Sequence, residues 1–137
     1  MTKEIKDKKA TVLGKNLGIS TKKAIAICKF IREKNPKVAI NLLEKVRREE
    51  LAIPMTGEIP HRKNMGQGRF PVKASSVFIK LLKSLSANAT SKGMDEEKIK
   101  IIIAKADKAA KQMRAGRMRR KFKNTHVFIS AEERERK

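Results

Sequence analysis

The sequence has few of the residues that catalytic and metal-binding sites usually require. Among 137 residues there are one cysteine, two histidines, no tryptophan and no tyrosine. The single cysteine, Cys28, excludes an internal disulfide, and two histidines with one cysteine are too few and too dispersed for a zinc site. An acid–base pair of His61 and His126, as in a small ribonuclease, lacks a third group to orient either imidazole. We therefore expect no enzyme, no bound metal and no cofactor.

Long apolar runs are absent as well. The longest fall far short of the ~20 residues that a membrane-spanning helix needs. The first fourteen residues, "MTKEIKDKKATVLG", lack the apolar stretch of a signal peptide. These absences favour a cytoplasmic protein. Cys28 lies in the apolar run "AIAICKFI" and is expected to be a small buried hydrophobic residue.

Acidic residues are scarce and unevenly placed. There are 35 Lys and Arg against 14 Asp and Glu, which gives a formal charge of +21. No acid occurs from 59 to 94 or from 108 to 131, and "RAGRMRRKFK", residues 114–123, has six cations in ten positions. A solvated face normally mixes both signs, so this pattern indicates a polyanionic partner. Nucleic acid is the first candidate and an anionic membrane surface is the alternative.

Aromatic residues make up 4% of the chain, which argues against a platform that stacks single-stranded bases. Zinc-finger spacing, leucine heptads after a basic region and a GXXG loop are all missing. The predicted mode is therefore recognition of the backbone and shape of folded RNA. An architectural, nucleoid-type DNA-binding protein is the alternative.

The spacing of apolar residues predicts three helices, at 20–35, 35–50 and 72–93. Ser20 or Thr21 is the expected N-cap of the first helix. In the second, Asn35 is a capping residue and Pro36 suits the first helical position. Gly93 is expected to end the third. The predicted buried stripes are Ala24, Ile25, Ile27, Cys28, Phe30 and Ile31; Val38, Ala39, Leu42, Leu43 and Val46; and Val77, Phe78, Leu81, Leu82, Leu85 and Ala89.

Three strands are also expected, so the predicted fold class is α+β. The sequence predicts a short edge strand at residues 10–19 and a second strand at residues 124–133. Between them in sequence, Ile99, Ile101 and Ile103 alternate with Lys98 and Lys100, with Ile102 as the one exception, and predict a strand with one buried face. Residues 105–123 then form either the distal half of a hairpin or an amphipathic helix, and we favour the hairpin.

Three motifs, in this order and spacing, resemble those of one family: "GRFPVKAS" at 68–75, "SANATSKGMD" at 86–95 and "NTHVFI" at 124–129. The chain is similar to the universal large-subunit ribosomal protein twenty-two family over about residues 10–133. The long Pro/Gly loop before "GRFPVKAS" looks like the archaeal and eukaryotic branch, and the Lys- and Ile-rich composition favours an archaeal origin. The run "MRAGR" lacks the proline that the family usually has there, and the hairpin is a few residues shorter.

The resemblance implies one domain over 1–137, with three helices on a small antiparallel three-stranded sheet. It implies a β-hairpin arm at about 99–130 and a basic Pro/Gly loop at about 52–71. The implied function is that of a structural constituent of the large ribosomal subunit, which supports folding and assembly of its RNA and contributes the arm to the wall of the polypeptide exit tunnel. The implied partners are large-subunit ribosomal RNA, neighbouring ribosomal proteins and the nascent polypeptide, with no membrane.

The charge pattern and the resemblance together indicate three groups of RNA-binding residues. The arm contributes Lys111, Arg114, Arg117, Arg119, Arg120, Lys121 and Lys123. The loop and the start of the third helix contribute His61, Arg62, Lys63, Arg69 and Lys73, and a third patch consists of Lys15, Lys22 and Lys23. The tunnel-facing tip of the arm is expected at Met113, Arg114, Ala115, Gly116, Arg117 and Met118.

Overall fold

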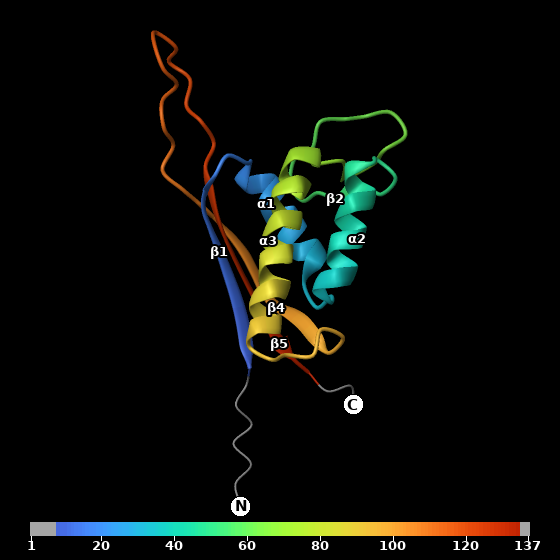
Figure 1. Cartoon of the computed structure of the whole chain (residues 1–137). Helices are drawn as coiled ribbons and strands as arrows, with labels where there is room; N and C mark the ends of the chain where they lie inside the picture. Colours follow the sequence, from blue (N-terminus) through green and yellow to red (C-terminus); the bar gives the residue numbers. More distant parts are fainter. Residues whose placement is uncertain (1–7, 135–137) are drawn as a thin grey trace, which may run out of the picture.

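The computed structural model describes residues 8–134, in which three helices cover one face of a three-stranded antiparallel sheet (Figure 1). The sheet has the order β1-β5-β4, so β5 is its central strand. This confirms the predicted α+β class. The main elements are β1 (Lys9–Leu17), α1 (Thr21–Ile31), α2 (Pro36–Arg47), α3 (Val72–Ser91), β4 (Ile99–Lys108) and β5 (Thr125–Glu133).

The core lies between the sheet and the helices. Alternate residues of β5, namely Val127, Ile129 and Ala131, are fully buried on the face that meets the helices. Phe78 of α3 and Ile27 of α1 are fully buried as well. Burial of such side chains is worth about 1.5–3 kcal/mol each, which makes this layer the main source of stability. None of the residues named here is basic, so this layer is stabilised by apolar burial.

The predicted starts of the helices and the stop at Gly93 are confirmed, whereas α1 and α2 end at Ile31 and Arg47, short of the predicted 35 and 50. The Asn35 side chain accepts a hydrogen bond from the Lys37 N–H at 2.9 Å, and Pro36 opens α2. Gly93 follows α3 with φ +66°, a left-handed conformation that glycine adopts without strain. Ser20 occupies the N-cap position of α1, but its side chain makes no capping hydrogen bond.

Two of the predicted stripes are too wide. Val38 is 50% exposed and Ile25 is 39% exposed. In each helix the residue lies at the margin of the apolar stripe, beyond the surface that the neighbouring elements cover. Leu42 and Phe30 are only partly buried, so the true contact faces are narrower than sequence spacing predicts.

Strand β4 contains an irregularity that reverses its alternation. The pairing with β5 shifts between Ile101 and Ile103, with Ile102 as the extra residue. Such a bulge moves every later side chain to the opposite face. Ile103 is therefore 45% exposed and Ala104 is buried, which corrects the prediction that Ile103 shares a buried face with Ile99 and Ile101.

A residue of α3 and the residues directly after α1 and α3 bond to the backbone of both outer strands. On β4, the Arg32 guanidinium donates to the Ala104 carbonyl at 2.9 and 3.2 Å. On β1, the side-chain amide of Asn88 donates to the Thr11 carbonyl at 3.0 Å, and Lys92 Nζ donates to the Lys9 carbonyl at 2.6 Å. Both sheet edges are thus tied to the helical layer.

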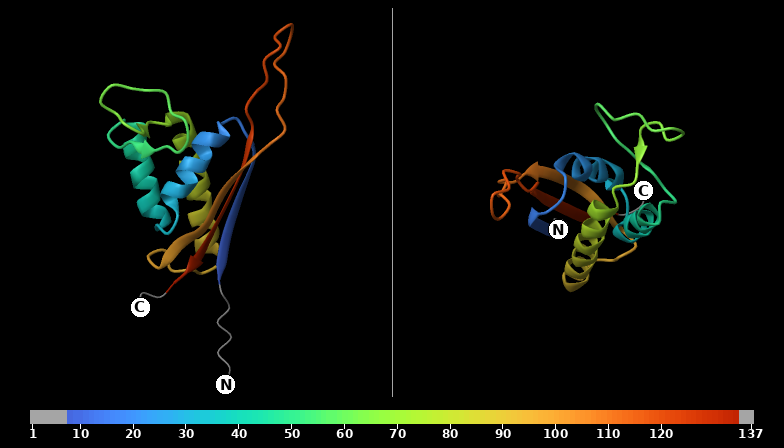
Figure 2. Two further views of the ribbon diagram at one scale, coloured as in Figure 1. Left: turned by 180° about the vertical axis from the view of Figure 1, so that it is seen from behind. Right: turned by 90° about the horizontal axis from the view of Figure 1, so that it is seen from above.

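Two segments extend from the same end of the body (Figures 1 and 2). The first, residues 109–124, joins β4 to β5 and is called the arm below. It forms an extended hairpin with a single bridge between Met113 and Lys121, which supports the hairpin reading over the helix. The second is the loop between β2 (Ile53–Pro54) and β3 (Gly68–Arg69), two short strands that pair with each other. Within residues 8–134, no helix is long and apolar enough to cross a membrane.

Candidate nucleic-acid interface

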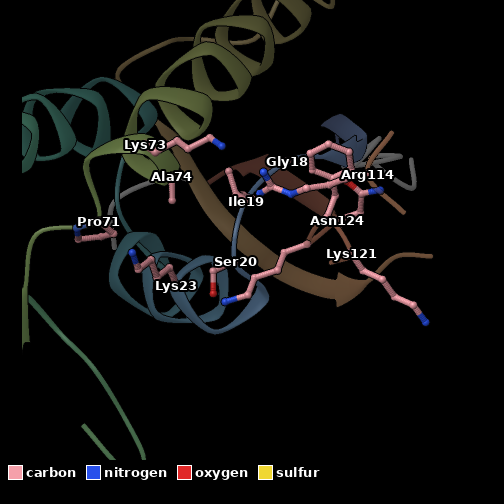
Figure 3. Close-up of a pocket in the computed structure, with 12 residues that line it drawn as sticks. Gly18, Ile19, Ser20, Lys23, Pro71, Lys73, Ala74, Arg114, Lys121 and Asn124 are labelled. Atoms are coloured by element: carbon pink, nitrogen blue, oxygen red, sulfur yellow. The ribbon is translucent and has the colours of Figure 1, made fainter. Parts of the chain in front are cut away.

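A hollow of about 490 Å³, called the arm hollow below, lies where the arm leaves the body. Three segments that are distant in sequence contribute cations to it: Lys23 from α1, Lys73 from α3, and Arg114, Lys121 and Lys123 from the arm. Figure 3 shows Lys23, Lys73 and Arg114 around the hollow, with Lys121 extending outward. None of the residues that line it is acidic. The structure therefore brings together members of all three predicted groups.

The fold places this hollow at the beginning of two helices. Ser20 precedes α1 and Pro71 precedes α3, and both line the hollow. Neither helix has an acidic residue in its first turn, and neither has a side-chain cap. The first backbone N–H groups of a helix carry a partial positive charge, so both helices add to the field of the lysines and arginines.

The arm presents its cations to solvent. Residues 110–123 are all exposed, and in the free protein their like charges repel one another. Lys111, Arg117, Arg119 and Arg120 lie on this exposed stretch, and Gly116 adopts φ +77° at the turn. The guanidinium of Arg114 lies 4.9 Å from the centre of the Phe122 ring, which orients it across the arm.

A second hollow, called the loop hollow below, lies between the start of α1 and the loop. It has a volume of about 550 Å³. Its lining includes Lys22, Lys23, Arg62 and Arg69, so Lys23 borders both hollows. The Lys22 ammonium also donates to the Glu58 carbonyl at 2.7 Å, which ties the loop to α1.

Arg69, a predicted RNA contact, is hydrogen-bonded within the protein. Its guanidinium donates to the carbonyls of Gly66 at 3.1 Å, Gly68 at 2.7 Å and Pro60. These bonds use the guanidinium to brace the loop. His61, Arg62 and Lys63 are exposed on the same loop and remain available to a partner. Lys15 is exposed on β1 and lines neither hollow.

The histidines and the cysteine do not form a catalytic group. His126 accepts a hydrogen bond at Nδ1 from the Asn16 N–H at 3.1 Å and lines a small depression on the sheet that His61 does not reach. Cys28 is buried in α1, and desolvation raises the pKa of its thiol to about 12. Within the part of the chain that the structure describes, no cluster of His, Cys, Asp or Glu is arranged to hold a metal ion.

Sequence reasoning missed Phe122 and Asn124 as parts of the interface. Both line the arm hollow, and Asn124 Nδ2 donates across the arm to the Ala110 carbonyl at 3.0 Å. The signal in the sequence was Phe122, a lone aromatic residue between lysines in "RKFK". A motif this short cannot be interpreted without the position of Arg114.

The fold and the charge distribution together define a class: small α+β proteins with a strongly basic extended arm, a charge pattern that is typical of nucleic-acid-binding proteins. Comparison with known proteins narrows this class. Residues 12–129 match the family of ribosomal protein L22p/L17e, and the chain belongs to that family, in its archaeal branch.

Three archaeal relatives carry the name large ribosomal subunit protein uL22. The chain is 38% identical to the protein of Archaeoglobus fulgidus over 77% of this chain and 72% of that one. It is 36% identical to the protein of Methanocaldococcus jannaschii, covering 93% and 89% of the two chains. For Sulfolobus acidocaldarius the identity is 34%, with 90% and 88% covered.

Proposed function

We propose that the chain is a structural constituent of the large ribosomal subunit and binds large-subunit ribosomal RNA with its arm and its two hollows. Membership of the L22p/L17e family makes it a ribosomal protein rather than an enzyme. The names of its archaeal relatives support a place in the large subunit, in the cytoplasm, with RNA and other ribosomal proteins as partners.

The observation that carries the proposal is the convergence of cations on the arm hollow. Lys23, Lys73 and Arg114 come from three segments, and no acid lies among the residues that line the hollow. Holding these charges together costs free energy in the isolated protein. Phosphate groups remove that cost, and they release their condensed counterions when lysine and arginine replace them. Lys23 and Lys73 are thus fixed on the body, and the arm adds its own cations to the surface that they offer to an RNA backbone.

The arm extends this surface away from the body (Figure 1). Its tip, at Met113, Arg114, Ala115, Gly116, Arg117 and Met118, is exposed throughout. In our proposal the flanking cations lie between RNA phosphates, and the tip contributes to the wall of the exit tunnel, where it meets the nascent polypeptide. The irregular, thinly bonded backbone of the arm supports this role, because such a segment takes its final shape on its partner.

The test is RNA binding across a salt series, with fragments of large-subunit RNA and the full chain. We expect the triple variant Arg117→Ala, Arg119→Ala and Arg120→Ala to reduce the slope of log K against log salt by about two, since each lost phosphate contact removes about 0.7–0.9.

The matched control replaces Lys29, Lys45 and Lys83 by alanine. These three lysines are exposed on the helices and line neither hollow, so the slope should change less although the net charge falls equally. A slope that the arm variant leaves unchanged would place the arm away from phosphates. Duplex DNA that binds as tightly as the RNA at matched salt would favour an architectural DNA-binding protein.

A further inference from the structure

We propose that the loop hollow is a binding site for one unstacked RNA base, with guanine preferred. The inference rests on the proposed function, because it names the part of the RNA that this hollow takes. The hollow is lined by Lys22 and Lys23 of α1, by Glu49 after α2, by residues of the loop, and by Phe70 and Pro71.

Apolar residues make up about half of the lining of the loop hollow and form one part of its wall. Met55 is 4% exposed, while Ile59, Met65 and Phe70 are partly buried, and all four line the hollow. A phosphate gains nothing from such walls, whereas the flat face of a base is stabilised by contact with an aromatic ring and with polarizable sulfur. A volume of about 550 Å³ falls in the range of sites that enclose small organic groups, about 300–1,000 Å³.

The cations are arranged for the phosphates that flank such a base. Lys23 lines both hollows, so the two hollows are neighbours and one RNA strand could place phosphates in the arm hollow and a base in the loop hollow. Arg62 is exposed at the second hollow. Arg69 is held by loop carbonyls and keeps the wall in place. This charge favours a nucleotide over an uncharged side chain of a protein partner.

Glu49 sets the preference for guanine. It is the only acid among the residues that line the hollow, and no cation within residues 8–134 forms an ion pair with it. A carboxylate repels phosphate but accepts two hydrogen bonds side by side. Guanine presents two adjacent donors, N1–H and N2–H, on its Watson–Crick edge, whereas uracil presents one donor between two acceptors. The exposed carboxylate is thus matched to the guanine edge.

The methionines provide a direct test by NMR of the full chain with ¹³C-labelled methyl groups. Met55 and Met65 line the loop hollow, Met113 and Met118 lie on the exposed arm, and Met94 is buried elsewhere as a control. The probes are the RNA pentanucleotide UUGUU and a pentamer with the same phosphates and no bases. We expect UUGUU to shift Met55 and Met65 by the ring current of its base, and the abasic pentamer to leave both in place while it still perturbs Met113 and Met118.

The outcomes separate this inference from the proposed function. If UUGUU moves the arm signals but not Met55 or Met65, the base site is overturned and RNA binding stands. If no signal moves, the base site is overturned, and the salt series with large-subunit RNA decides the proposed function separately. Equal shifts of Met55 and Met65 with both probes overturn the base site, because charge alone then accounts for them. A leucine dipeptide amide that shifts these methionines when UUGUU does not would assign the hollow to a protein side chain.

The role of Glu49 is tested by comparing affinities for UUGUU and UUUUU. We expect the natural chain to prefer UUGUU by about tenfold, the effect of one good bidentate contact. Glu49→Gln removes one of the two carboxylate acceptors. It should bring the ratio of the affinities for UUGUU and UUUUU close to one. Glu50→Gln is the matched control, because Glu50 is exposed, carries the same charge and does not line the hollow. A preference that survives Glu49→Gln, or that Glu50→Gln abolishes equally, overturns the assignment.

Discussion

The hydroxyl oxygens of Thr21 and Thr125 lie 2.9 Å apart, at the point where the arm joins the body. Thr125 is fully buried, and its hydroxyl donates to the Ile19 carbonyl at 2.9 Å. Because that bond uses the only proton of Thr125, the Thr21 hydroxyl donates in the pair. One buried oxygen thus joins the segment after β1, the first residue of α1 and the base of the arm.

We expect Thr125→Val to lower the free energy of unfolding by about 1–3 kcal/mol, because it keeps the shape of the side chain but leaves the Ile19 carbonyl without its partner. Thr21→Val should cost less, since its hydroxyl is only half-buried. Urea denaturation of the three proteins measures both differences. A Thr125→Val protein as stable as the natural one would show that water replaces the hydroxyl.

Asn35 joins α2 to β4, which makes a second prediction. Its Oδ1 caps α2, while Nδ2 donates to the carbonyls of Glu96 at 2.8 Å and Ile99 at 3.0 Å. Asn35→Ala loses the cap, about 1 kcal/mol, and these two bonds, so we expect a total loss of about 2–3 kcal/mol.

Asn35→Asp separates the two contributions to stability. It keeps the capping oxygen but loses both donors, so its unfolding free energy should fall between those of the alanine variant and the natural chain. Thermal unfolding monitored by circular dichroism gives the order. Equal losses for the aspartate and alanine variants would mean that the cap contributes little and that the bonds to β4 dominate.

Cys28 provides a prediction that depends on pH. Burial raises the pKa of the folded thiol from 9.0 to about 12, so the folded state retains its proton while the unfolded state releases it. This contribution to stability is fully present below pH 9 and is lost as the pH rises from 9 toward 12. At pH 8 a disulfide reagent should modify Cys28 slowly in the native protein and rapidly in urea. Fast modification of the native protein would contradict the buried thiol.

The contact between Arg114 and Phe122 predicts the dynamics of the free arm. Backbone bonds from Phe122 N–H to the Gln112 carbonyl at 2.7 Å and from Arg114 N–H to the Arg120 carbonyl at 3.0 Å close its bridge. We expect amide exchange across 109–123 to be much faster than in β5, because the arm has no core to pack against.

Phe122→Ala should accelerate exchange further at the backbone amides of positions 114 and 122, and it should leave the thermal midpoint of the body unchanged. Met118→Ala is the matched control, since Met118 is 62% exposed and takes no part in the bridge. Slow exchange along the whole arm of the natural protein would mean that the arm is ordered without RNA.

Local chemistry explains which parts of the fold are predictable from sequence. The start of α2 at Asn35 and Pro36 and the stop at Gly93 depend on the conformation of one or two residues, so the sequence alone reveals them. The exposure of the Ile103 side chain depends on a bulge in β4. This bulge is defined by the pairing with β5, which the sequence does not reveal. The exposure of Val38 likewise depends on how far the neighbouring elements extend over α2.

In the candidate site, too, local features can be predicted from the sequence, whereas features that depend on the tertiary fold cannot. The cations of the arm are visible as a run without acids, but nothing local indicates that Arg114 meets Lys23 and Lys73, since their meeting requires the topology of the whole body. The bracing role of Arg69 was hidden for the same reason, because the carbonyls of Pro60, Gly66 and Gly68 converge on it only in the folded loop.

The bonds that Arg32, Asn88 and Lys92 make to the outer strands affect how the free protein can pair with other chains. Unpaired strand edges are templates for pairing with other chains, and lysine or arginine at an edge opposes that pairing. Here the carbonyls of Ala104, Thr11 and Lys9 are already occupied from within the chain. These bonds leave fewer edge carbonyls for a strand of another copy to pair with before the protein joins its partner.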